Sequence, residues 1–194
     1  MHWLASKMAQ KIMKEANMDD KYRLIYEYGC ELFLSTSASI LSIIFFSLVL
    51  NVLYSSIVFL TVFMGIRFFS GGYHATTYFH CFVLTNLVYL ISYIASLAFV
   101  KYIGIAGEIF LIWAATCIIV VFSPIRHKNH PLSENSYRRN ARIARIITLA
   151  IAFSTTVLSI RFSCNPVLSL VVVTLIAVAV MMIPKILEGA CQNE

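Results

Sequence analysis

The sequence predicts an all-α integral membrane protein in which six hydrophobic helices follow an N-terminal amphipathic helix at the membrane interface. Of the 194 residues, 60% are hydrophobic and the mean hydropathy is +0.82, which is far above the range of soluble globular domains. The apolar residues also gather in stretches close to the roughly 20 residues that a helix needs to cross a bilayer. Because no polar stretch is long enough to fold alone, we expect one membrane domain over residues 1–194.

Residues 1–17 are predicted to form a helix on the membrane surface. One face of this helix is apolar and contains Leu4, Met8 and Ile12. Another face is basic and contains Lys7, Lys11 and Lys14. A helix of this kind lies in the interface of an anionic membrane, so anionic lipids are expected partners. An equally weighted alternative is that these residues are a cationic segment whose only role is to set the topology of the first span. Asp19 or Asp20 is expected to cap the helix that follows.

The helical membrane bundle is predicted over residues 20–187. Its six apolar stretches are, to within a few residues, Glu31–Leu50, Val52–Phe69, Phe79–Val100, Tyr102–Phe122, Ile143–Phe162 and Val167–Ile186. Ser123 and Pro124 are expected to end the fourth helix, and Asn165 is expected to cap a sixth helix that begins at Pro166. The long connection between spans is a basic loop over residues 124–142.

The basic residues predict how the chain is oriented in the membrane. With the N-terminus in the cytoplasm, Lys101 and Arg161 are the two basic residues on the opposite side, which leaves 13 of the 15 on the cytoplasmic side. Cytoplasmic loops of membrane proteins carry such an excess of Lys and Arg. We therefore expect a multi-pass protein of the cell membrane with both termini, and the segment after the second span, in the cytoplasm.

The segment between the second and third spans carries groups that indicate covalent chemistry. Gly71 and Gly72 form a flexible pair, His74 follows, and Cys81 comes seven residues later, so a thiol nucleophile and its base are present. On one continuous helix they would lie about 10 Å apart, so the chain must bend at the glycines and a new helix must begin just before Cys81. The N-terminus of that helix stabilises a thiolate, and backbone N–H groups nearby can hold an oxyanion.

Two charged residues flank this segment or lie near it in the predicted bundle. Arg67 ends the second apolar stretch, where a guanidinium needs a partner or access to water. Glu31 is expected to pair with Arg67 or to orient His74, and its alternative role is an interfacial carboxylate in water. His80 is a rival base, but it lies on a different helix face from Cys81. His74, His80 and Cys81 lack a fourth ligand, so we expect neither a metal site nor another cofactor.

Three motifs resemble those of the accessory gene regulator B family, membrane endopeptidases that mature quorum-sensing peptides in bacteria. In chain order they are Tyr28-Gly29-Cys30-Glu31, the run from Arg67 through Gly71-Gly72-Tyr73-His74-Ala75 to Cys81, and Ser123-Pro124-Ile125-Arg126-His127-Lys128-Asn129-His130-Pro131-Leu132. The phenylalanines after Arg67 and the extra His80 are minor departures from the family pattern.

The resemblance implies a reaction and a set of partners. Cys81, activated by His74, attacks the scissile bond of a short amphipathic propeptide and expels its acidic C-terminal tail. A Cys or Ser of the peptide then attacks the thioester and closes a thiolactone or lactone ring. Gly71, Gly72 and Arg67 are supporting positions. A homodimer is expected from the resemblance and from the apolar surface, and no nucleic acid partner is expected.

The basic stretch after the fourth span suits an acidic peptide tail. The cations expected to bind it are Arg126, Lys128, Arg138, Arg139 and Arg142. The alternative for this stretch is that it only sets topology. Two other functions are open for the whole chain, namely a small transporter or channel component and a non-enzymatic scaffold that binds a partner through the basic loop. The gathering of polar groups at one cytoplasmic end favours the peptidase over the transporter.

Overall fold

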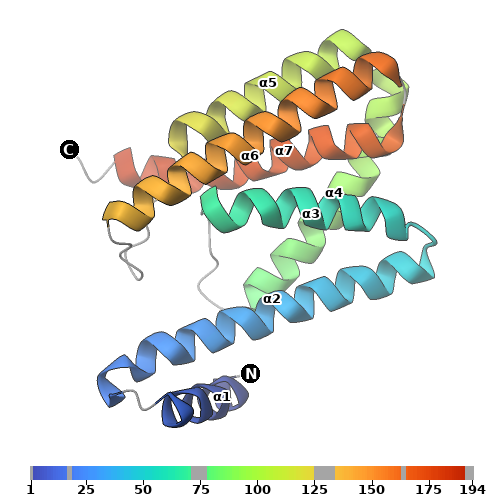
Figure 1. The fold of residues 1–194 in the computed structure, drawn as a ribbon. Coiled ribbons are helices and arrows are strands. Elements are labelled where there is room, and N and C mark those ends of the chain that lie inside the picture. The colour runs from blue at the N-terminus through green and yellow to red at the C-terminus, as the bar shows by residue number, and fades with distance from the viewer. Residues whose placement is uncertain (1, 17–18, 71–77, 125–133, 163–164, 191–194) are drawn as a thin grey trace. The chain divides into compact units, whose positions relative to one another are not determined.

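The computed structural model describes residues 2–16, 19–70, 78–124, 134–162 and 165–190. Within these ranges the chain forms seven α-helices, one 3-10 turn and no strand (Figure 1). The elements are α1 (His2–Glu15), η1 (Asp20–Tyr22), α2 (Arg23–Val49), α3 (Leu53–Ser70), α4 (Tyr78–Tyr102), α5 (Ile105–Phe122), α6 (Glu134–Arg161) and α7 (Pro166–Ala190). All except α1 and η1 are long and apolar enough to cross a membrane. The predicted all-α multi-pass membrane fold with six hydrophobic helices is confirmed.

Two of the membrane helices begin earlier than the apolar stretches that predicted them. α6 begins at Glu134, ahead of the apolar stretch from Ile143, and α2 begins at Arg23, ahead of the stretch from Glu31 and close to the start expected from Asp19 or Asp20. Their first turns carry charged and polar side chains, which end a hydropathic stretch but do not end a helix, because Glu and Arg are good helix formers. The predicted loop over residues 124–142 is therefore wrong in its second half, which is helical from Glu134 onward.

The predicted boundaries around the fourth and sixth spans are confirmed. α5 ends at Phe122 and Ser123 is its C-cap. α7 begins at Pro166, and the Val167 N–H donates a hydrogen bond of 2.9 Å to Oδ1 of Asn165. Asn165 thus satisfies an N–H group that the first turn of a helix leaves without a partner, and proline follows it where no N–H is needed.

By its internal contacts the chain divides into two compact units, each of which is described by itself. Unit 1 comprises Met1–Leu50 and His74–Leu87, and unit 2 comprises Asn51–Tyr73 and Val88–Glu194. Among the described residues, unit 1 therefore contains α1, α2 and the first turns of α4. Unit 2 contains α3, the remainder of α4, and α5 to α7. The single domain expected from the sequence stays a prediction.

In unit 1, α1 packs against α2 through small side chains. Ala5 and Ala9 are fully buried and form a core with Cys30, against which Met8, Tyr26 and Leu34 also pack. The predicted apolar face is only partly the buried one, because Leu4 and Ile12 are 46% and 42% exposed. A helix over these residues is confirmed, whereas its amphipathic character and its place at the membrane interface stay predictions. The predicted cap of α2 is wrong: its N-cap residue is Tyr22, with no side-chain cap bond.

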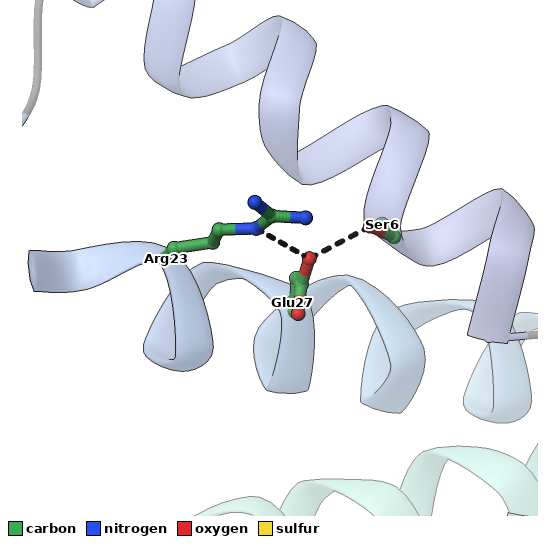
Figure 2. A network of polar contacts seen from close by, with 3 residues as sticks. All are labelled: Ser6, Arg23 and Glu27. Atoms are coloured by element: carbon green, nitrogen blue, oxygen red, sulfur yellow. Dashed lines mark hydrogen bonds and ion pairs between the residues drawn. The ribbon is translucent and has the colours of Figure 1, made fainter. Parts of the chain in front are cut away.

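A carboxylate joins the two helices of unit 1 at the edge of their contact (Figure 2). Oε1 of Glu27 accepts a hydrogen bond of 2.7 Å from Oγ of Ser6 and one of 3.0 Å from Nε of Arg23. The side chain of Glu27 is 12% exposed and that of Arg23 is 48% exposed, so the pair lies where protein meets solvent. The network fixes the rotation of α1 against α2 by a polar contact beside the alanine core.

Unit 2 is organised around its last helix. α7 packs against α3, α5 and α6, and Figure 1 shows α5, α6 and α7 running side by side. In the most apolar window of α7 56% of the residues are buried, against 33% at most in the other five spans. The fully buried side chains of this core include Phe59, Phe63, Ile66, Ile112, Ile119, Leu170, Val172, Leu175 and Met182.

Several polar side chains inside unit 2 are paired with other helices or with their own backbone, whereas the buried hydroxyls of Thr116, Ser123 and Ser159 have no hydrogen-bond partner among the described residues. Glu108 of α5 is 6% exposed, and its Oε1 accepts a short hydrogen bond from Oγ of Ser169 in α7, which is fully buried. The hydroxyls of Ser56 in α3 and Tyr89 in α4 lie 2.6 Å apart. Thr148 and Thr174 donate to the carbonyl one turn earlier in their own helices. Such back-bonding lets a hydroxyl stay in an apolar helix without an unmet hydrogen bond.

Candidate active site

Cys81 is the fourth residue of α4, whose first residue is Tyr78. The expectation that a helix begins just before Cys81 is confirmed. Its side chain is partly buried, and the thiol is not in a disulfide. The N–H groups of a first helical turn have no partner within the helix and carry partial positive charge. Cys81 therefore lies beside backbone N–H groups that can donate hydrogen bonds to a nearby anionic oxygen.

The turn after Cys81 carries two polar side chains that bond to the helix backbone. Oγ1 of Thr85 donates a hydrogen bond of 2.9 Å to the carbonyl of Cys81, and Nδ2 of Asn86 donates one of 2.9 Å to the carbonyl of Phe82. Thr85 is 5% exposed. His80 is exposed, unlike Cys81, which agrees with their expected positions on different helix faces. The two bonds lie within α4 and satisfy the polar groups of Thr85 and Asn86 in an otherwise apolar segment.

Arg67 lies in the last turn of α3 and contacts α7. Its Nη1 is 3.1 Å from Sδ of Met181, and its guanidinium carbon is 5.3 Å from the centre of the Phe63 ring. A polarizable thioether and an aromatic face both interact favourably with a cation. The helix C-terminus adds partial negative charge. Arg67 is thus fixed against the core of unit 2.

The expected pair of Arg67 and Glu31 stays a prediction. Glu31 lies in α2, where its side chain is partly buried, and it belongs to unit 1, whereas Arg67 belongs to unit 2. Sequence reasoning missed Met181 as a neighbour of Arg67. No local signal could have found it, because the two residues are 114 positions apart and their contact depends on how α3 and α7 are aligned.

Several residues of the predicted site lie outside the described residues. They are Gly71, Gly72 and His74 between α3 and α4, and Arg126 and Lys128 between α5 and α6. Their roles as base, supporting turn and tail-binding cations stay predictions. Among the residues that the structure does describe, no group of three or more His, Cys, Asp or Glu side chains is placed to hold a metal ion.

Three of the predicted tail-binding cations lie in the first turns of α6. Arg138, Arg139 and Arg142 are all exposed and occupy adjoining positions of the helix surface. Glu134 forms an exposed ion pair of 3.3 Å with Arg138, which offsets part of the positive charge. Arg145, one turn further, has a structural role, because its Nε donates a hydrogen bond of 3.2 Å to the carbonyl of Val120 in the last turn of α5.

Comparison with known proteins assigns the chain to a family. The family model for accessory gene regulator B (AgrB) matches residues 5–184. The chain belongs to the AgrB family. It is 28% identical over 162 residues to AgrB-like protein 2 of Clostridium perfringens strain 13, an alignment that covers 79% of this chain and 74% of that protein. No solved structure shows a significant match.

A second relative agrees with this assignment. The chain is 24% identical over 166 residues to an AgrB-like protein of Clostridium perfringens strain SM101, with 81% of this chain and 76% of the relative covered. Membership of the AgrB family confirms the resemblance drawn from the three motifs. It supports involvement in the processing of accessory gene regulator peptides.

The AgrB-like motifs occupy distinct places in the fold. The first, Tyr28–Glu31, lies within α2, and its Cys30 is buried against α1 rather than placed for chemistry. The second ends in the first turn of α4 at Cys81. The third begins at Ser123, directly after α5. Sequence reasoning did not foresee the packing role of Cys30, because its partners Ala5 and Ala9 lie in a different helix.

Proposed function

We propose that this AgrB family member is a membrane-embedded cysteine endopeptidase. It cleaves the C-terminal tail from a short quorum-sensing propeptide and closes the remaining peptide into a thiolactone or lactone. The observation that supports this most is the position of Cys81, a partly buried thiol in the first turn of a membrane helix. The other two cysteines whose surroundings are described differ, since Cys30 is buried in a packing core and Cys117 is exposed within α5.

In the first half of the reaction, His74 takes the proton from Sγ of Cys81 and the thiolate attacks the scissile carbonyl carbon. Negative charge develops on the carbonyl oxygen, and N–H groups of the first turn of α4 are available to stabilise it. The C–N bond then breaks, and His74 passes its proton to the nitrogen of the departing tail. The products are a free tail with a new amino terminus and a thioester on Cys81.

In the second half, a Cys or Ser side chain within the peptide gives its proton to His74 and attacks the thioester carbon. A new S–C or O–C bond closes the ring, the bond to Sγ of Cys81 breaks, and the thiolate regains the proton. No water is consumed, so water is only a competitor that would release a linear peptide. A site among apolar helices protects the thioester by excluding that water.

The exposed arginines of α6 suit the departing tail. Arg138, Arg139 and Arg142 present adjoining positive charges at the start of a membrane helix. An acidic tail would be attracted to them with a strength that falls as salt rises, because exposed charges are screened within about 10 Å at moderate ionic strength. In the predicted topology most basic residues lie on one side of the membrane, and cytoplasmic loops carry such an excess. This supports the proposal that the start of α6 and the start of α4 both face the cytoplasm.

Co-expression with the candidate propeptide in a bacterial host tests the nucleophile and its base. We expect the wild-type chain to release the tail and form a cyclic product lighter than the linear peptide by one water. Cys81→Ser and His74→Ala should lose both activities by at least about a thousandfold. Cys117→Ser, the same exchange at an exposed cysteine of α5, is the matched control and should process normally. Tail release by Cys81→Ser at the wild-type rate would exclude the proposal.

A modified propeptide separates cleavage from ring closure. When the ring-forming Cys or Ser of the peptide is replaced by Ala, the thioester on Cys81 has no internal acceptor and should accumulate. Intact-protein mass spectrometry would show the adduct, and hydroxylamine would remove it, because thioesters react with that nucleophile. If the tail were released by wild-type protein with no adduct at early times, direct hydrolysis would replace the acyl-enzyme mechanism.

A further inference from the structure

The contact between α1 and α2 fixes which sides of α1 remain open. Ala5 and Ala9 are fully buried against α2, and Ser6 donates to Oε1 of Glu27. A helix held by two buried alanines one turn apart and by a polar contact beside them cannot rotate without breaking both. Because the rotation of α1 is fixed, the same side chains of α1 always face away from α2.

The outer surface of α1, as we name it, combines cations with single large apolar side chains. Its members are Trp3, Leu4, Lys7, Lys11, Ile12 and Lys14, all exposed. At 100° per residue the three lysines point away from Ala9, which faces α2, and Leu4 and Ile12 lie on the flank between. Trp3 is 66% exposed, and Nζ of Lys7 is 4.0 Å from the centre of its ring. Glu15 is the acidic residue of α1.

The length of α2 places this surface near the headgroups of the membrane. α2 has 27 residues, about seven more than a helix needs to cross the hydrocarbon layer. Its first two turns carry Arg23 and Glu27, which belong outside that layer. α1 packs beside Tyr26, Cys30 and Leu34 of α2. These residues extend from one residue before Glu27 to about two turns after it. A helix packed there lies at the boundary between headgroups and acyl chains.

We propose that the outer surface of α1 binds the anionic headgroups of the leaflet in which α2 begins, and that the contacts of Glu27 with Ser6 and Arg23 fix the rotation in which it does so. Lysines on one side with aliphatic residues and a tryptophan beside them match the chemistry of an anionic lipid surface. A peptide helix as partner would need a continuous apolar groove. α1 does not offer one, because Met8, which lies between the exposed Leu4 and Ile12, is packed against the core shared with α2.

Tryptophan fluorescence in the full-length chain tests the proposal. The chain has two tryptophans, so Trp113→Phe leaves Trp3 as the sole reporter. The protein is placed in nanodiscs that contain equal fractions of brominated phosphatidylcholine or brominated phosphatidylglycerol. Each lysine near an anionic surface contributes about fivefold to binding. We therefore expect stronger quenching of Trp3 by the brominated anionic lipid at low salt, and an equal effect of the two lipids at high salt.

Two sets of variants identify the groups responsible. Lys7→Gln, Lys11→Gln and Lys14→Gln together should remove the preference for the anionic lipid. Lys101→Gln with Arg161→Gln, in the last turns of α4 and α6, is the control and should keep it. Ser6→Ala retains every lysine and should weaken the preference by loosening the rotation of α1.

Three results would overturn the proposal. The first is equal quenching of Trp3 by the two lipids in the parent chain at low salt. The second is a preference for the anionic lipid that persists in the triple lysine variant. The third is no quenching by either lipid, together with a blue shift of Trp3 emission when an amphipathic peptide is added. The last result would make the peptide the occupant. The salt dependence of the parent chain needs no lysine substitution, so the test does not depend on how the variants fold. None of these outcomes bears on the chemistry of Cys81.

Discussion

A glutamate joins two helices in each unit of this protein, but the two glutamates are held in different ways. Glu27 in unit 1 lies at an edge open to solvent and accepts hydrogen bonds from a hydroxyl and from the guanidinium of Arg23. Glu108 in unit 2 is buried between α5 and α7 and accepts a hydrogen bond from the neutral hydroxyl of Ser169. The ion pair of Glu27 and Arg23 has the larger formal attraction, but water and salt ions can solvate its two groups when it opens.

The difference shows that position outweighs charge in these contacts. An exposed ion pair contributes little to the free energy of unfolding, because water solvates both groups when the pair opens. A buried hydrogen bond has no such replacement, so loss of one partner leaves the other with an unmet hydrogen bond at a cost of about 1–3 kcal/mol. We therefore expect the stability of unit 2 to depend more strongly on its buried hydrogen bonds than that of unit 1 depends on the ion pair at its edge.

The largest effect is expected from Glu108→Ala. The change leaves a cavity between α5 and α7 and removes the acceptor of Ser169, so the free energy of unfolding should fall by about 2–4 kcal/mol. Unfolding of the purified protein in detergent micelles, followed by circular dichroism, measures this. Glu108→Gln keeps the shape and an acceptor oxygen and should cost less than about 1 kcal/mol. Equal losses for Ala and Gln would mean that the hydrogen bond to Ser169 is not what matters.

Ser169→Ala should have the next largest effect. It removes the donor and leaves the carboxyl group of Glu108 buried, for an expected loss of about 1–3 kcal/mol. The same unfolding assay, applied to both single variants and to the double variant, gives their interaction energy. We expect the double variant to lose less than the sum of the single losses. Strict additivity would show that the two side chains do not act as a pair.

Tyr89→Phe should have a moderate effect, about 1 kcal/mol. The change removes a hydroxyl 2.6 Å from Oγ of Ser56, but the Ser56 hydroxyl also donates to the carbonyl of Val52 at 3.1 Å and so keeps a partner. The ring contact with Phe59, 5.2 Å between centres, is retained. Tyr54→Phe, at a tyrosine that is 71% exposed, is the matched control and should leave the unfolding midpoint unchanged.

The smallest effect is expected from Arg23→Gln. Because its partner Glu27 also accepts from Ser6 and lies at a solvent-exposed edge, the loss should stay below about 1 kcal/mol and should shrink at high salt. Unfolding midpoints at low and high ionic strength measure this for Arg23→Gln and for Ser169→Ala in parallel. The comparison between the units fails if the buried pair is the salt-sensitive one.

Hydropathy predicted the membrane helices because the bilayer imposes the same length on each of them. It failed at the first turns of α2 and α6, where charged residues such as Arg23 and Glu134 continue the helix beyond the hydrocarbon layer. The start of α4 just before Cys81 was predictable, because a thiol and an imidazole seven residues apart cannot meet on one continuous helix.

Contacts between helices were not predictable in the same way. The partners Met181 of Arg67 and Ser169 of Glu108 lie 114 and 61 residues away in the chain. The periodicity of one helix indicates its buried side but not its alignment with another. The buried side of α1 overlapped only in part with the expected apolar face, since Ala5 and Met8 of that face pack against α2 but Leu4 and Ile12 are exposed.

The central place of α7 has a consequence for how the protein is made. α7 is the last of the six membrane helices to leave the ribosome, yet α3, α5 and α6 all pack against it. Until it is inserted, Glu108 is in the membrane without Ser169, which is costly in hydrocarbon. A chain interrupted before Pro166 would therefore lose the arrangement of unit 2 as well as one span. Unit 2 can therefore reach its folded arrangement only after α7 has been synthesised. Chains that lack α7 are expected to be substrates of membrane quality-control proteases.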